Sequence, residues 1–104
     1  MLLTNLKDIL LKVITPDETL FIGNISQVVL PGIDGSFGIL KNHAPMISAL
    51  AKGTVKVDQL VAENNNDDFE GKYNLAFKDK DSFTFEINGG VIEVRENKVI
   101  VLAE

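Results

Sequence analysis

The single histidine of the chain, His43, is the first residue to test for chemistry, because imidazole transfers protons and binds metals near neutral pH. One histidine cannot form a histidine metal cluster, and no spacing of serine and aspartate around it suggests a catalytic triad. The chain has no cysteine, which excludes a nucleophilic thiol, a thiolate metal site and a disulfide. We therefore predict that His43 is a loop residue that fixes a turn through its neighbours.

Three glycines separated by two residues each, Gly32, Gly35 and Gly38, could let a backbone approach a phosphate group closely. The segment lacks the Lys-Ser/Thr pair of a phosphate-binding loop, and no helix is expected to follow it. Backbone geometry is the better explanation for these glycines. The sequence predicts no nucleotide site.

A polar run that includes Asn64, Asn66 and Asp68 imitates the opening of a calcium-binding loop. The sixth position of that pattern is Phe69 where the loop requires glycine, and no helical pattern flanks the run. Paired carboxylates elsewhere lie in polar turns, where nothing apolar would raise a pKa for acid catalysis. We expect no metal, no cofactor and no catalytic residue.

The elements that carry these residues belong to one domain, 1–104, because the chain has 104 residues, 45% of them hydrophobic and 24% charged. The net charge of −5 argues against nucleic acid and anionic lipid as partners and favours protein. The apolar run 9–11 is far shorter than a membrane span, and the N-terminus lacks the pattern of a signal peptide. We expect no direct lipid insertion.

Short apolar runs rich in Val, Ile and Phe, each closed by a turn residue, predict an all-β domain: a two-sheet β-sandwich or flattened barrel of about ten strands. We expect strands at 9–15, 24–30, 46–51, 54–60, 73–77, 83–87, 91–94 and 98–102, and one short strand inside an ordered loop over 32–45. Residues 1–8 are expected to be an extension, 18–23 a linker that carries core residues Leu20 and Phe21, and 62–72 a mobile polar surface loop. Strands 73–77 and 83–87 are expected to form a hairpin, and Gly89 and Gly90 to supply positive φ at a tight turn. Strands 91–94 and 98–102 are expected to form a last hairpin around Glu96 and Asn97.

The segments Leu30-Pro31-Gly32, Gly35 to Leu40 and Asn42-His43-Ala44-Pro45 together resemble the N-terminal domain of the epsilon subunit of F-type ATP synthase. The resemblance continues through Val13 to Pro16, Ala51-Lys52-Gly53, Asn88 to Val94 and the closing strand 97–104, in the same order. It implies a β-sandwich in the central stalk, or rotor, which docks the gamma subunit onto the membrane c-ring and couples rotation to ATP synthesis. It also implies a non-catalytic, peripheral subunit on the cytoplasmic face of the bacterial inner membrane, in a complex that transports protons.

Carried over position by position, the resemblance assigns two surfaces. The c-ring-facing residues are expected to be Asp34, Gly35, Ser36, Lys41, Asn42, His43, Ala44 and Pro45, and the gamma-facing residues Val13, Ile14, Thr15, Ala51, Lys52 and Gly53. Ser36 departs from the family, which often has an acidic or longer polar side chain there. Asn42 stands where glycine is common, and asparagine tolerates the left-handed conformation that glycine would supply. Because the sequence ends at Glu104, we expect a short form without the inhibitory C-terminal helical hairpin.

An alternative from another class is a stand-alone β-sandwich that binds a small ligand or acts as an enzyme through His43, Asp34 and Asp58. That hypothesis requires the three side chains to converge in one pocket. Co-purification with a gamma subunit would favour the first hypothesis, and a saturable small-molecule ligand would favour the second.

Overall fold

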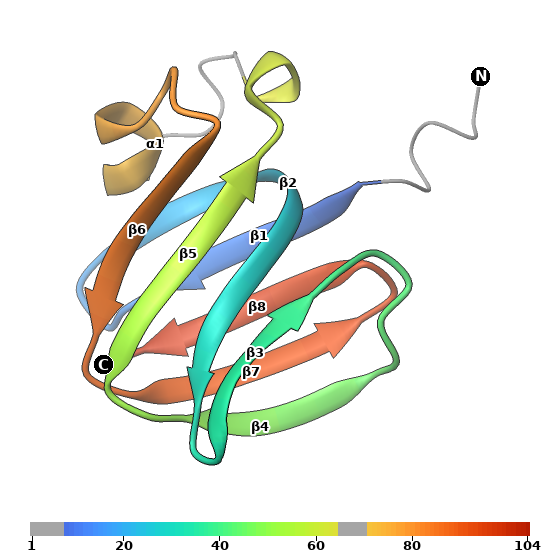
Figure 1. Ribbon diagram of the computed structural model, residues 1–104. Helices are drawn as coiled ribbons and strands as arrows, with labels where there is room; N and C mark the ends of the chain where they lie inside the picture. The colour runs from blue at the N-terminus through green and yellow to red at the C-terminus, as the bar shows by residue number, and fades with distance from the viewer. Residues whose placement is uncertain (1–7, 65–70) are drawn as a thin grey trace.

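The computed structural model describes residues 8–64 and 71–104, and Figure 1 shows their arrangement. The elements are β1 (Ile9–Ile14), β2 (Thr19–Gly32), β3 (Gly35–Ile39), β4 (Met46–Leu50), β5 (Gly53–Gln59), a 3₁₀ turn (Val61–Glu63), α1 (Lys72–Ala76), β6 (Ser82–Ile87), β7 (Gly90–Arg95) and β8 (Lys98–Ala103). The predicted all-β sandwich is confirmed, and the described residues form eight strands. The expected extension 1–8 lies outside the described residues except for Asp8.

The strands form two layers that are joined through β2. One layer has the order β1-β8-β7-β4, and the other consists of β3, β2, β5 and β6 (Figure 1). The first half of β2 pairs with β1 and its second half pairs with β3, while β5 pairs with its opposite edge. A single residue pair, Gly32 with Leu50, connects β2 to β4 and so links the two layers at a second point. One long strand therefore holds both layers in register.

The length of β2 corrects one sequence expectation. Residues 19–23 were expected to be part of a linker, but they continue the strand without a break. The expected core positions are right, since both Leu20 and Phe21 are buried. Leu20 and Phe21 are adjacent and both buried, so the segment lacks the alternation that predicts a strand, and pairing with β1 makes it one.

The segment 73–77 was predicted to be a strand paired with 83–87, and this prediction is wrong. Residues 72–76 form the short helix α1, and β6 pairs with β5 instead. Helical spacing places Tyr73 and Phe77 on one face, where their rings pack against Phe83 and Phe85, while Leu75 is 72% exposed. Alternation of apolar residues over five positions fits a strand and a helical turn equally well, so tertiary packing decides between them.

Asparagine and glutamine side chains attach this helical segment to the sheet. The Asn74 side-chain amide accepts a hydrogen bond from the Ile22 N–H at 2.9 Å and donates one to the Ile22 carbonyl at 2.7 Å. Asn64 makes the same pair of contacts with Asn24, at 2.7 and 2.9 Å. The Leu60 N–H also donates to the Asn24 carbonyl. Beyond the end of β5, the side-chain amides of Asn64 and Asn74 therefore bind the edge of β2 where a paired strand would otherwise lie. We call residues 60–64 and 71–80 the edge cover.

Gln59 anchors the edge cover from inside the domain and is only 7% exposed. Its Nε2 donates to the carbonyl oxygens of Phe77 and Lys80 at 2.7 and 2.6 Å, and its Oε1 accepts from Asn64 Nδ2 at 3.1 Å. Of the predicted mobile loop 62–72, residues 62–63 belong to the 3₁₀ turn, Asn64 is bound by Gln59 and Asn24, and Lys72 begins α1, while residues 65–70 lie outside the described residues. The polar composition of this stretch does not reveal that the side-chain amide of Asn64 binds the backbone of β2.

Candidate functional site: surfaces for protein contacts

The outer face of the β1-β8-β7-β4 layer carries a continuous apolar row across all four strands. Strand register aligns Ala49 with Val91, Val91 with Leu102, and Leu102 with Ile14. Val91 and Leu102 are 42% and 52% exposed, which is unusual for apolar side chains in the middle of a sheet. We call these four residues the apolar row.

A shallow hollow of about 410 Å³ lies at one end of the apolar row. It is lined by Ile14, Thr15, Pro16, Gly90, Val91, Leu102, Ala103 and Glu104. Gly90 has φ of +150°, and a Cβ there would lie 2.3 Å from the Leu102 carbonyl oxygen, so only glycine fits this position. The predicted positive φ at Gly89 and Gly90 is confirmed. Gly90, which lines the hollow, places no side chain in it.

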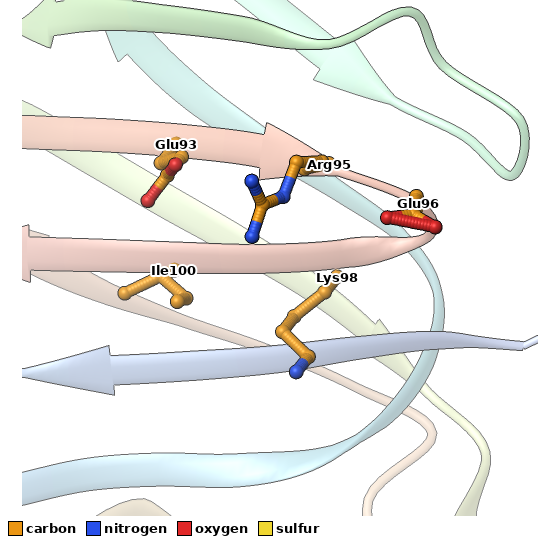
Figure 2. Close-up of a pocket in the computed structure, with 5 residues that line it drawn as sticks. All are labelled: Glu93, Arg95, Glu96, Lys98 and Ile100. Carbon is orange, nitrogen blue, oxygen red and sulfur yellow. The ribbon is translucent and has the colours of Figure 1, made fainter.

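Charged residues occupy the opposite end of the same outer face. Glu93 and Arg95 project from β7, and Lys98 and Ile100 project from β8, around a hollow of about 260 Å³ that Glu96 closes at the turn (Figure 2). The face thus changes from apolar at the end that holds Ile14 to charged at the β7–β8 turn. A partner would need an apolar surface with charged groups beside it to match both ends.

Three of the predicted gamma-facing residues, Ile14, Thr15 and Ala51, lie at the apolar end, while Val13 is buried and Lys52 and Gly53 lead into β5. Val13 is fully buried in the core, so its side chain takes no part in any surface. Ile14 and Thr15 line the hollow, and Ala51 lies at the same end of the layer because Leu50 pairs with Gly90, which pairs with Ala103. Lys52 is exposed in the connection between β4 and β5.

Two of these residues also have structural roles. The Thr15 hydroxyl accepts hydrogen bonds from the backbone N–H groups of Asp17 and Glu18, which shapes the turn between β1 and β2. A Cβ at Gly53 would lie 2.7 Å from the Cβ of Pro31, so this glycine permits close packing inside the domain. A large side chain at 53 would disturb the fold as well as any interface.

The predicted c-ring-facing residues fall into two groups at opposite ends of β3. Asp34, Gly35 and Ser36 lie at the tip of the β2–β3 hairpin, close to the turn 51–53 that was predicted to face gamma, because Pro31 O accepts a hydrogen bond from Ala51 N. Residues 41–45 lie in the loop between β3 and β4, at the other end (Figure 1). Ser36, Gly38 and Leu40 are all exposed and join the two groups along β3.

The loop 41–45 is shaped by two residues that the sequence singled out. Asn42 has φ of +65°, which confirms that asparagine adopts the left-handed conformation here. His43 Nδ1 lies 2.7 Å from the Ala44 carbonyl oxygen, and since a carbonyl only accepts, Nδ1 carries the proton. This contact agrees with the prediction that His43 fixes a turn through its neighbours, which stays a prediction.

The alternative site does not assemble. Asp34 is at the hairpin tip, His43 is in the loop at the far end of β3, and Asp58 lies within β5, where it pairs with Ser82. Within residues 8–64 and 71–104, no group of three His, Cys, Asp or Glu side chains is placed to hold a metal ion. In the same ranges, no helix is both long and apolar enough to cross a membrane.

Sequence reasoning missed Asn97, which contacts the loop from the β7–β8 turn. Its Oδ1 accepts a hydrogen bond from Asn42 N–H at 2.6 Å. An Asn in a two-residue hairpin turn is ordinary, and the segment 91–102 was expected to be a hairpin around Glu96 and Asn97. That hairpin is confirmed, but nothing in the sequence connects position 97 with position 42.

The fold and its exposed faces define a two-layer β-sandwich whose outer surface suits protein contacts. The sequence model of the ATP synthase Delta/Epsilon chain β-sandwich domain matches residues 8–66. The chain therefore belongs to the ATP synthase delta/epsilon family. It is 36% identical over 94 residues to the ATP synthase epsilon chain of Chlorobium limicola, an alignment that covers 90% of this chain and 86% of that one.

Other relatives are longer than the matched region. The ATP synthase epsilon chain of Salinibacter ruber is 39% identical over 92 residues, which cover 88% of this chain and 55% of the relative. Among solved structures, a chain of the Euglena gracilis mitochondrial ATP synthase (OSCP, F1 and c-ring) superimposes with a TM-score of 0.67 at 19% identity. The superposition covers 93% of this chain and 51% of that chain and supports the same fold.

Proposed function

We propose that this chain is an epsilon-type rotor subunit in the central stalk of a proton-translocating ATP synthase, where it docks the gamma subunit onto the c-ring. The proposal rests on membership of the delta/epsilon family and on similarity to ATP synthase epsilon chains. The subunit acts as a rigid coupling element without catalysis of its own, at the cytoplasmic face of the bacterial inner membrane. It holds no nucleotide.

The apolar row is the observation that carries the docking function. Four outward-facing apolar side chains on adjacent strands would be costly to leave in water at roughly 25 cal/mol per Å² of apolar surface, so a partner that covers them gains stability. We assign this face to the gamma subunit, which would contact Ile14, Thr15, Ala51 and Lys52 at its apolar end. The sandwich transmits torque because its packed core resists deformation.

We assign the c-ring contact to the exposed residues along β3, Ser36, Gly38 and Leu40, and to the two groups of predicted c-ring-facing residues at its ends. The repeated polar loops of a ring can touch both the hairpin tip, Asp34 to Ser36, and the loop 41–45. Such a contact is polar and solvent-exposed at its rim, and an exposed polar pair of this kind is worth about 0.2–1 kcal/mol. His43→Ala should therefore weaken the coupling of ATP hydrolysis to proton pumping only in part.

Co-purification with the gamma subunit tests the proposal. The unmodified chain should capture gamma, and Leu102→Asp should weaken capture at least tenfold because it places a charge within the apolar row. Leu75→Asp is the matched control, since Leu75 is also exposed but lies on α1, away from that face. Circular dichroism should be the same for all three proteins. Undiminished capture by Leu102→Asp would remove the apolar row from the gamma interface, and a saturable small-molecule ligand in place of gamma would favour the alternative.

A further inference from the structure

Two asparagines in the left-handed conformation face each other across 55 positions of sequence. Asn42, in the loop 41–45, has φ of +65°, and Asn97, in the β7–β8 turn, has φ of +60°. Asn97 Oδ1 accepts a hydrogen bond from Asn42 N–H at 2.6 Å, and Asn97 Nδ2 donates to Asn42 Oδ1 at 3.4 Å. The Asn97 side chain therefore binds both the backbone and the side chain of Asn42.

The loop depends on this contact because it has little else to fix it. Residues 40–45 lie between β3 and β4 and belong to neither ladder. Within the described part of the chain, one side chain from another element, that of Asn97, forms hydrogen bonds with the loop. Asn97 is itself held, since its backbone carbonyl accepts a hydrogen bond from Leu10 N at 3.0 Å. The pair thus ties the loop to β1 and to the last hairpin.

We propose that Asn97 is a positioning residue for the loop 41–45: it holds Asn42, and with it His43, in the shape that the c-ring contacts, although it lies outside the loop itself. This inference rests on the proposed function. A loop that is already ordered loses less conformational entropy when a partner binds than one that must be ordered at that moment. Loss of the Asn97 amide should therefore weaken docking without unfolding the domain.

The test uses variants that separate the amide from the backbone conformation. Asn97→Gly keeps access to positive φ and removes both hydrogen bonds to Asn42, whereas Asn97→Asp keeps an Oδ1 acceptor for the Asn42 N–H. Glu96→Gly is the matched control, because Glu96 also has positive φ, at +53°, in the same turn. Each variant is assembled with gamma and c-ring, and its affinity and the hydrogen exchange of the Asn42 amide are measured.

We expect Asn97→Gly to bind the gamma–c-ring complex about tenfold more weakly and to lose protection of the Asn42 amide. Asn97→Asp should keep most of that protection and bind within about threefold of the unmodified chain, and Glu96→Gly should change neither quantity. Unchanged affinity of Asn97→Gly despite loss of protection would overturn the positioning role and leave the proposed function intact. Failure of the unmodified chain to bind the complex would overturn the proposed function, and the positioning role with it.

Discussion

The loop 41–45 and the edge cover are both held by asparagine side chains, but in different surroundings. In the loop, one exposed amide, that of Asn97, contacts one residue. In the edge cover, the amides of Asn64 and Asn74 each bind both backbone groups of a β2 residue in partly buried positions, and the buried Gln59 supports them. Water can replace the first contact and cannot readily replace the second. The same side chain therefore shapes a surface in one place and sustains the fold in the other.

Gln59→Leu should have the largest effect on stability. The substitution removes three hydrogen bonds and leaves the carbonyl of Lys80 and the Asn64 amide without that partner in a partly buried setting. Unsatisfied buried polar groups cost about 1–3 kcal/mol each, so the free energy of unfolding should fall by about 3 kcal/mol. Urea denaturation measures it. A loss below about 1 kcal/mol would mean that water enters the edge cover and the comparison with the loop fails.

Asn74→Ala should have the second-largest effect on stability. It removes the side-chain partner of both the N–H and the carbonyl of Ile22 and should lower the free energy of unfolding by about 2 kcal/mol. Hydrogen exchange should show faster exchange of the Ile22 amide while the Asn24 amide, bound by Asn64, stays protected. Leu75→Ala, at the neighbouring exposed position, is the control and should change stability by less than about 0.5 kcal/mol. Simultaneous loss of protection at both amides would show that the edge cover opens as one unit.

Asn97 substitutions should have a smaller effect on stability. Asn97→Gly should change the free energy of unfolding by less than about 1 kcal/mol, because the lost hydrogen bonds are exposed and glycine accepts the backbone conformation. Asn97→Ala should cost about 1 kcal/mol more than Asn97→Gly, since alanine is strained at φ of +60°. Thermal denaturation of the two variants separates backbone strain from the amide contact. Equal stability of the two would assign the whole effect to the amide.

Glu63→Gln, in the 3₁₀ turn of the edge cover, should have the smallest effect. Desolvation raises the pKa of Glu63 above its usual value, and a hydrogen bond and like charge from Asp8 raise it further. The folded state therefore binds the Glu63 proton more tightly than the unfolded state does. The stabilisation that this bound proton provides is complete below the unfolded pKa of 4.5 and is lost as the pH rises through the raised folded pKa.

The variant should be slightly more stable than the unmodified chain at pH 7, by less than about 0.5 kcal/mol because Glu63 is exposed, and the gap should close as the pH falls toward 4. Melting temperatures across that range measure it. A gap that widens in acid would contradict the raised pKa.

The two regions also differ in how far sequence predicts them. Turn residues predicted the loop: Asn42 in the left-handed conformation and His43 bound to the next carbonyl follow from local chemistry. The edge cover was not predicted, because its polar composition is typical of solvated loops and Tyr73, Leu75 and Phe77 also fit a strand. Local signals predict structure where neighbours in sequence supply the contacts.

The sequence by itself determined the all-β class, the strands β1 and β4 to β8 with errors of one residue at their ends, the presence of one short strand within 32–45, the glycine turn before β7, and the resemblance to the family. These features depend on residue-by-residue alternation and on backbone conformations that few residues adopt. Only the tertiary structure decided that β2 continues through 19–23, that Val13 is buried, and that Asp34 and His43 lie at opposite ends of β3. Strand pairing across the sheet also created the apolar row and joined Asn42 to Asn97, because register brings together residues that share no local pattern.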